Sequence, residues 1–216
     1  MKNQIIYLLA VLFIISAAAC KKENNTPTCD NCPDSVSDYS QLAIGNYWVY
    51  EIQTVNEAGE DTELYGIDSV YIAGDTLING ETYFIQKNTQ SLFGGIYKQA
   101  LLRDSSDFIV NNKGKILLST SIFDKVIQEI DGAEGRFHIN YTMVDKDLEI
   151  EVPAGIFKTY NFRGIIHFNE DLISVAINDR AINNYYAKDI GLIKSNIFFA
   201  HSPFSFERRL LRYHIE

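Results

Sequence analysis

Four acidic side chains have the spacing best suited to chemistry in this sequence: Asp145, Asp147, Glu149 and Glu151. On one continuous strand they would share a face, because successive side chains of a strand alternate between its two faces. Carboxylates gathered in this way can hold a hard cation such as calcium, or raise one another's pKa for acid–base catalysis by a hydrolase. A solvated outer face, with a turn at Lys146, explains the pattern without a ligand, and we favour it. The four residues stay candidates for a metal site, but we predict no metal and no cofactor.

The histidines and the known catalytic motifs give no further candidate. The four histidines are His138, His167, His201 and His214. They lack the close pairing of a zinc site such as H-E-x-x-H. The sequence also lacks the G-x-S-x-G nucleophile elbow and the glycine-rich loops that bind phosphates. We therefore predict that the protein is not an enzyme and has no catalytic residue.

The N-terminus carries a cysteine whose surroundings are those of a lipidation site. Lys2 precedes an apolar run of fifteen residues over 5–19, which ends in three alanines directly before Cys20. Small residues before a cut and a cysteine after it are typical of the signal peptide of a lipoprotein. The run is short of the roughly 20 residues that span a bilayer as a helix. We predict a signal peptide over 1–19 and a palmitate-type acyl anchor on Cys20; a simple cleaved signal and a membrane-spanning anchor are the alternatives.

The two other cysteines, Cys29 and Cys32, are separated by two residues. This spacing occurs in disulfide loops, in redox motifs and in halves of zinc sites. A redox motif lies between a strand and a helix, whereas these cysteines are flanked by Pro27 and Pro33. A second CxxC, which would complete a zinc site, is not in the sequence. Because an exported protein meets oxidising conditions, we predict a small structural disulfide between Cys29 and Cys32.

The charge of the chain excludes one class of partner. Removal of residues 1–19 takes away Lys2 and leaves 18 basic against 28 acidic residues, so the formal charge changes from −9 to −10. Binding to nucleic acid requires basic residues that displace counterions from the phosphates. We therefore predict no nucleic-acid partner, and attachment to a membrane through the N-terminal lipid. Residues 20–41 hold few bulky apolar side chains and are predicted to be a flexible tether.

The residues from 42 to 216 show the alternation of half-buried strands. In the segment 47–54, Trp48, Tyr50 and Ile52 alternate with polar side chains. Asn79-Gly80 is typical of a type I′ hairpin turn, and Gly74-Asp75 is interpreted as another turn. Further strands are expected throughout, including 172–178, with a short helix considered over 122–130. We predict an all-β fold: one antiparallel domain of about 10–12 strands, either a curved half-barrel or a two-layer sandwich.

Aromatic and basic residues of this domain could bind a ligand. The sequence contains 13 Tyr, 13 Phe and one Trp, most of which we assign to the core. Exposed aromatic rings would stack on glycans or hold lipid chains. Arg208 and Arg212 are predicted to share a strand face with Leu210. There they would pair with carboxylates of a neighbouring strand, or bind a ligand anion.

Several segments together resemble those of one group of proteins. They are Gly45-Asn46-Tyr47-Trp48-Val49-Tyr50-Glu51, 68–71 with 75–80, Val152-Pro153-Ala154-Gly155-Ile156-Phe157, and 186–193. With the signal peptide and the polar tether, the chain resembles the uncharacterised β-rich lipoproteins of Bacteroidota bacteria. The resemblance implies a place in the cell envelope, and Lys21-Lys22-Glu23 is similar to the surface-export tags of that group. It supplies no catalytic residue.

These observations combine into one functional prediction with an alternative. We expect an outer-membrane lipoprotein, periplasmic or surface-exposed, with a non-enzymatic binding or structural role. Its ligand would be a glycan, a lipid or another envelope protein. The alternative is a carrier that holds an apolar ligand or lipid in the cavity of the curved sheet.

Overall fold

The computed structural model describes residues 34–90, 98–169, 171–172, 178–199 and 202–216. The chain divides into two units, Met1–Cys32 and Pro33–Glu216, and the fold described here is that of the second. The predicted signal peptide, Cys20, Cys29, Cys32 and His201 lie outside the described residues, as does most of the predicted strand 172–178.

Strands make up most of the second unit. They are β1 (Tyr47–Val55), β2 (Asp61–Ile78), β3 (Glu81–Asn88), β4 (Gln99–Ser105), β5 (Phe108–Asn111), β6 (Ile116–Ser119), β7 (Val126–Asp131), β8 (Phe137–Val152), β9 (Gly155–Phe168), β10 (Arg180–Ile182), β11 (Asn184–Ala187), β12 (Gly191–Phe198) and β13 (Ser205–His214). A short helix, α1 (Ser37–Ser40), precedes them, and one 3-10 turn, η1 (Ala133–Gly135), lies between β7 and β8.

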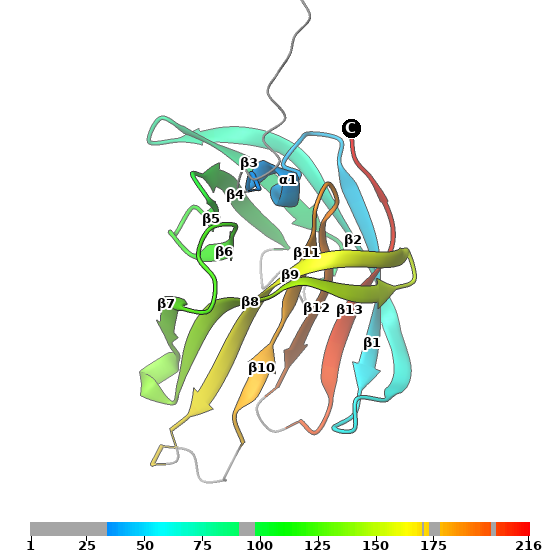
Figure 1. Ribbon diagram of the computed structural model, residues 1–216, viewed down its shortest axis with the longest axis vertical. Coiled ribbons are helices and arrows are strands. Elements are labelled where there is room, and N and C mark those ends of the chain that lie inside the picture. Colours follow the sequence, from blue (N-terminus) through cyan, green and yellow to red (C-terminus); the bar gives the residue numbers. More distant parts are fainter. Residues whose placement is uncertain (1–33, 91–97, 170, 173–177, 200–201) are drawn as a thin grey trace, which may run out of the picture. The chain divides into compact units, whose positions relative to one another are not determined.

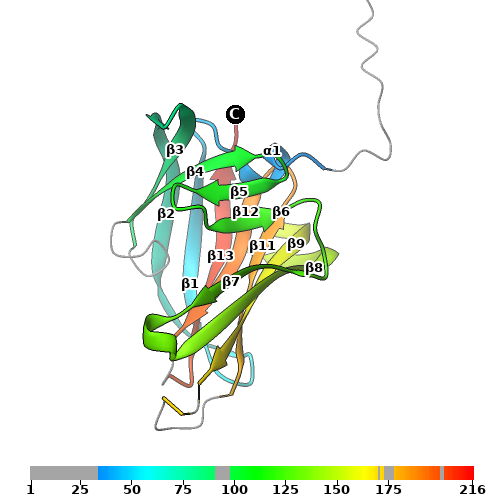
Figure 2. The same ribbon diagram turned by 90° about the vertical axis from the view of Figure 1, so that its left-hand side faces the viewer.

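All thirteen strands belong to a single antiparallel sheet that curls until its edges approach (Figures 1 and 2). The order is β6-β5-β4-β3-β2-β1-β13-β12-β11-β9-β8-β7, with β10 paired to β9. The first and last strands are thus neighbours in the middle of the order. At the β7 edge, the amide of Asp124, just before β7, donates to the carbonyl of Met143 on the neighbouring strand β8. The prediction of one antiparallel all-β domain is confirmed, as a nearly closed barrel-like sheet and not a two-layer sandwich.

Hairpin turns and bulges shape this sheet. Asn79 and Gly80 join β2 to β3 with φ angles of 54° and 85°, the positive values that a type I′ turn requires. Gly74-Asp75, interpreted from sequence as a turn, instead lies inside β2, where the register with β3 shifts between Ile72 and Asp75. A bulge takes extra residues into one strand and bends it without ending it. The 18-residue strand β2 can therefore follow the curve of the sheet.

The helix considered over 122–130 is not formed. Residues Val126–Asp131 are strand β7, which pairs antiparallel with β8. Ile127 and Ile130 pack against the core, and β-branched side chains favour a strand over a helix. Among the described residues, no helix has both the length and the apolar character needed to cross a membrane.

Two clusters of buried side chains fill the interior. One contains Val36, Tyr39, Ile109, Leu118, Ile139, Tyr141, Met143, Tyr160, Phe162 and Ile166. The other contains Trp48, Tyr50, Val70, Ile72, Val152, Ala187, Ile190, Ile193 and Leu210. Val36 and Tyr39 are only 4% and 3% exposed, although their sequence resembled a tether. The packed part of the chain therefore begins before Leu42, the predicted start of the domain.

Candidate functional site

The acidic run does not form a common face. The register of β8 on β9 shifts between Val144 and Leu148, and Asp145 and Asp147 have φ angles of 53° and 62°. Asp145 accepts hydrogen bonds from Arg163 at 2.5 Å and from Asn161 at 3.0 Å. This bulge breaks the alternation on which the predicted face depended.

The other acidic residues of the run point to solvent. Asp147, Glu149 and Glu151 are exposed, and Glu149 lies opposite Lys158 in the ladder. Of the intervening apolar residues, Val152 is buried, but Leu148 is 42% exposed. Within the described part of the chain, no group of three or more His, Cys, Asp or Glu is placed to hold a metal ion.

The described histidines have local partners. His138 contacts Asp131 at 2.8 Å and Asn140 at 2.5 Å, and hydrogen bonding to Asp131 raises the pKa of His138. The ring of His214 stacks on Tyr47, with 5.6 Å between the ring centroids. His167 contacts Asp179 at 2.6 Å.

A cavity of about 230 Å³ lies inside the curled sheet. Its walls include members of both core clusters, so the cavity lies where the two clusters meet. The lining residues come from nine strands and from the segment that contains α1. They are Tyr39, Ser40, Leu42, Trp48, Tyr50, Val70, Gln86, Asn88, Ala100, Leu102, Ile109, Leu117, Asn184, Tyr186, Leu192 and Arg208.

A buried ion pair gives this cavity a charged group. Arg208 on β13 donates from Nη1 to Oδ2 of Asp68 on β2 at 3.3 Å, and the two side chains are 9% and 0% exposed. The second oxygen of Asp68 accepts from Thr89 N, Thr89 Oγ1 and Gln90 N, at 3.1, 3.1 and 3.0 Å. The Arg208 guanidinium also lies over the ring of Tyr50, 4.5 Å from its centroid. Both charged groups thus have partners inside the protein, and these partners offset the free-energy cost of removing the charges from water.

Aromatic rings supply flat apolar walls whose polar atoms are satisfied. The indole N–H of Trp48 donates to the carbonyl of Ile190 at 2.7 Å, and the hydroxyl of Tyr50 donates to the carbonyl of Leu192 at 2.7 Å. Burial raises the pKa of Tyr50 above its ordinary value and that of Tyr186 to about 12. Both phenols are therefore neutral at physiological pH. This arrangement suits a molecule with an apolar body and one polar group.

The two arginines singled out in the sequence do not share a face. Between Val49 and Tyr50 the register of β1 on β13 shifts, so that Tyr50 lies opposite Leu210 and Val49 opposite Arg212. Arg208 and Leu210 are buried, whereas Arg212 is exposed. Arg208 does pair with a carboxylate, but on β2, which is separated from β13 by β1.

Some aromatic residues lie outside the core. Arg212 lines an open groove of about 470 Å³ on the outer face, together with Val49 and the tyrosines Tyr47 and Tyr71. Those tyrosines are 41% and 40% exposed. Trp48 is thus a core residue, whereas Tyr47 and Tyr71 are among the aromatic residues that lie outside the core.

Asp68 was missed by sequence reasoning. It occupies a strand position two residues before Val70, on the side that β2 turns inward. An acidic residue in phase with buried apolar residues is uncommon unless it is paired. That phase was the signal that could have identified Asp68.

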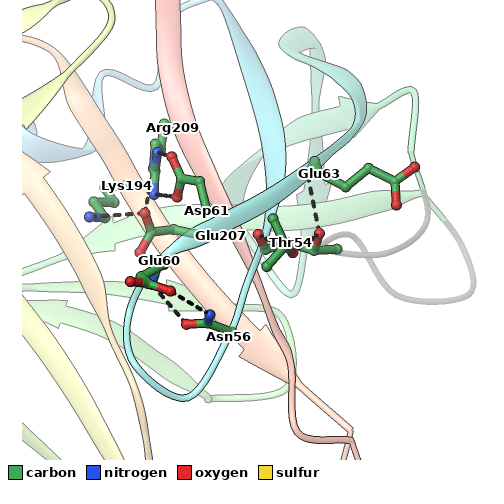
Figure 3. A network of polar contacts seen from close by, with 9 residues as sticks. Thr54, Asn56, Glu60, Asp61, Glu63, Lys194, Glu207 and Arg209 are labelled. Carbon is green, nitrogen blue, oxygen red and sulfur yellow. Dashed lines mark hydrogen bonds and ion pairs between the residues drawn. The ribbon is translucent and has the colours of Figure 1, made fainter.

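A second set of charges lies on the outer face, on β13, on its neighbour β12 and at the start of β2 (Figure 3). Arg209 donates from both Nη atoms to the two oxygens of Asp61, each at 2.6 Å, and also contacts Glu207. Glu207 in turn pairs with Lys194 at 3.0 Å. In the hairpin loop below, the side chain of Asn56 bonds Glu60. These partly exposed contacts lie within β13, between β13 and its neighbour β12, and across β1 to the start of β2, and none of these residues lines the cavity.

Comparison with known proteins gives a likeness in architecture alone. No protein-family profile and no curated protein matches the sequence. A solved structure from Bacteroides fragilis, named as an exported protein with a YmcC-like fold, has a TM-score of 0.49 at 12% identity and covers 82% of this chain and 98% of its own. Another, from Parabacteroides distasonis and named as a lipoprotein, has a TM-score of 0.38 at 11% identity, with 82% and 97% covered. Likenesses at this level say nothing about function.

Proposed function

We propose that this chain is an envelope lipoprotein whose curled sheet binds a small amphipathic molecule without transforming it. The observation that supports the proposal is the cavity between the two core clusters, with aromatic and aliphatic walls and the Asp68–Arg208 pair beside it. Anchoring through acylated Cys20 rests on the sequence, as does the place at the outer membrane. We therefore favour the carrier of an apolar ligand or lipid, which the sequence suggested as the alternative.

The size of the cavity limits its ligand. Cavities for drug-sized molecules measure roughly 300–1,000 Å³, and a dry cavity of about 150 Å³ can hold benzene. A volume of about 230 Å³ therefore suits a single ring, a short acyl chain or the end of a longer one. The guanidinium of Arg208 would orient a hydrogen-bond acceptor at one end of such a molecule.

The chemistry of the lining favours binding over catalysis. Arg208 is engaged by Asp68, and the lining phenols of Tyr50 and Tyr186 are held neutral by burial. Ser40 is the one serine or threonine among the described lining residues. Its Oγ donates to the Asp104 carboxylate at 3.0 Å. The usual general base that activates a serine hydroxyl is a histidine within hydrogen-bond distance. None of the described lining residues is a histidine.

Trp48 provides a direct test, because it lines the cavity and is the one tryptophan of the chain. We expect saturable changes in its fluorescence on titration with decanoate or with benzoate. Ala100→Phe, which adds a ring to the cavity wall, should abolish the change. Ala58→Phe, in the exposed loop between β1 and β2, is the matched control and should leave it intact. No saturable change with either probe, or equal binding by Ala100→Phe, would refute the proposal.

A further inference from the structure

The segment 34–42, here called the strap, contributes to the wall of the cavity. Figure 1 shows α1, which belongs to the strap, at one end of the curled sheet. Tyr39, Ser40 and Leu42 of the strap are lining residues of the cavity. The rest of the lining comes from the strands. A ligand that passes this end of the sheet must therefore pass the strap.

The first attachment of the strap is to the wall formed by β9 and β11. Asp34 accepts hydrogen bonds from the hydroxyl of Tyr160 on β9 and from Lys188 after β11, each at 2.6 Å. Tyr39 stacks on Tyr160, with ring centroids 4.7 Å apart. The amide of Asp189, in the same turn as Lys188, donates to the carbonyl of Asp38 at 2.6 Å. The start of the strap is thus held by one side of the sheet.

The second attachment is to the opposite wall. Ser40 donates from Oγ to Asp104 on β4 at 3.0 Å. In the sheet order, β3, β2, β1, β13 and β12 separate β4 from β11. In a sheet that curls back on itself, strands so far apart in the order face each other. The strap therefore crosses the interior from wall to wall instead of following one strand.

The strap is held by fewer and weaker contacts than the strands. Helix α1 has four residues, and its N-cap, Val36, makes no side-chain cap bond. The Lys188 side chain that anchors Asp34 is 49% exposed. The described strap buries two large apolar side chains, Val36 and Tyr39, against the core. Segments with few buried contacts open locally at a lower free energy than the sheet that supports them.

We infer that the strap is the gate of the cavity: residues 34–42 open as a unit to admit the ligand and close over it. This inference rests on the proposed binding function. Its physical basis is that the strap lines the cavity, bridges opposite walls and lacks ladder hydrogen bonds. Residues 34–41 of the strap fall within the segment predicted to be a flexible tether.

Hydrogen exchange tests the opening without a ligand. The amides of Ser40 and Asp189 report on the strap, and those of β1 report on the sheet. We expect the strap amides to exchange roughly tenfold or more faster than β1 amides. Asp34→Asn should speed the strap amides further, by up to about fivefold, the effect of losing one partly exposed ion pair. Asp61→Asn, an equal change at the outer-face pair with Arg209, should leave them unchanged. Exchange of strap and β1 amides at one common rate in all three proteins would overturn the gate.

Stopped-flow fluorescence of Trp48 tests the link to binding. With decanoate as the probe, Asp34→Asn should raise the association and dissociation rates together, by up to about fivefold, with little change in Kd. Asp61→Asn should match the unmodified protein. Identical rates in all three proteins would overturn the gate even if the probe binds. If the probe fails to bind at all, the binding function is refuted, and the exchange measurement still decides whether the strap opens independently.

Discussion

Arg208 and Arg209 are consecutive residues of β13 and enter opposite environments. Side chains alternate along a strand, so Arg208 enters the interior and Arg209 the outer face. Each pairs with an aspartate of β2: Arg208 with Asp68 and Arg209 with Asp61. The inner pair is 9% and 0% exposed, and the outer pair is 19% and 49% exposed.

The outer pair has the shorter hydrogen bonds, but we expect the inner pair to matter more for stability. The outer pair has two hydrogen bonds of 2.6 Å, and the inner pair has one of 3.3 Å between Nη1 and Oδ2. Water screens the outer charges and solvates either partner when the other is lost. The inner charges have no such substitute, so the loss of one leaves the other desolvated. The inner pair should therefore be far more sensitive to substitution, despite its longer contact.

The largest effect is expected from Arg208→Met. This change keeps an apolar stem of similar length but leaves the Asp68 carboxylate buried and without its cation. Breaking a buried pair in this way costs about 3–5 kcal/mol of unfolding free energy. Urea unfolding followed by circular dichroism measures the loss. A cost below about 1 kcal/mol, as for a surface pair, would remove the contrast between the two arginines.

A double variant separates the stranded charge from lost packing. Asp68→Asn combined with Arg208→Met removes both charges, while the side-chain carbonyl of the introduced asparagine can still accept from the Thr89 and Gln90 amides. We expect the double variant to recover part of the stability that Arg208→Met loses. If it recovers none, the cost comes from the other contacts of Arg208, including that with Tyr50, and not from the Asp68 charge.

An intermediate effect is expected from the strap pair, Asp34 and Lys188, whose side chains are 25% and 49% exposed. Burial alone would raise the pKa of Asp34, but hydrogen bonds from Lys188, Tyr160 and Tyr39 outweigh it and lower the pKa to about 2. The unfolded value is about 3.9. A carboxylate with a lowered pKa stabilises the fold above its unfolded pKa, and this contribution disappears as the pH falls from about 4 to 2.

The measurement is the difference in unfolding free energy between the unmodified protein and Asp34→Asn as a function of pH. After allowance for solvent screening, we expect a difference of about 1 kcal/mol above pH 5. It should shrink between about pH 4 and pH 2. A difference that stays constant down to pH 2 would show that the Asp34 charge adds nothing to the strap.

The sequence predicted local alternation well and long-range closure less well. Trp48, Tyr50 and Ile52 are all buried, as their spacing indicated. The register shifts opposite Leu211 and after Val144 could not be read from the pattern. A shift of one residue moves every later side chain to the other face. This is why Arg212 separates from Arg208. On β8 the register moves by two residues between Val144 and Leu148, and there the left-handed backbone of Asp145 and Asp147 interrupts the alternation, so that Asp145 separates from Glu149.

The cavity and its strap could not be predicted from the sequence, because both depend on contacts between residues that are distant in the sequence. Asp68 and Arg208 are 140 positions apart, and a pattern along one strand cannot show which strand faces it. Most of the strap falls in the predicted tether because residues 20–41 hold few bulky apolar side chains. The single turn that contains Val36 and Tyr39 is also too short to show a helical period. Tyr39 is covered by Tyr160, on a strand more than a hundred residues later.

The smallest effect is expected from Arg209→Met, the outer counterpart of Arg208→Met. The pKa of Arg209 is raised mainly by its hydrogen bonds to Asp61, and the pKa of Asp61 is lowered by the same contact, so the two charges do attract. Exposed pairs nonetheless contribute about 0–1 kcal/mol, and at 1 M salt the screening length falls to about 3 Å. Arg209→Met should therefore cost a few tenths of a kcal/mol in urea unfolding at about 50 mM salt and almost nothing at 1 M.

The cost of Arg208→Met should persist at both salt concentrations, because solvent ions do not reach the buried Asp68 carboxylate. Equal costs for the two substitutions at low salt, or an equal loss of both at high salt, would mean that the inner pair is solvated like the outer one.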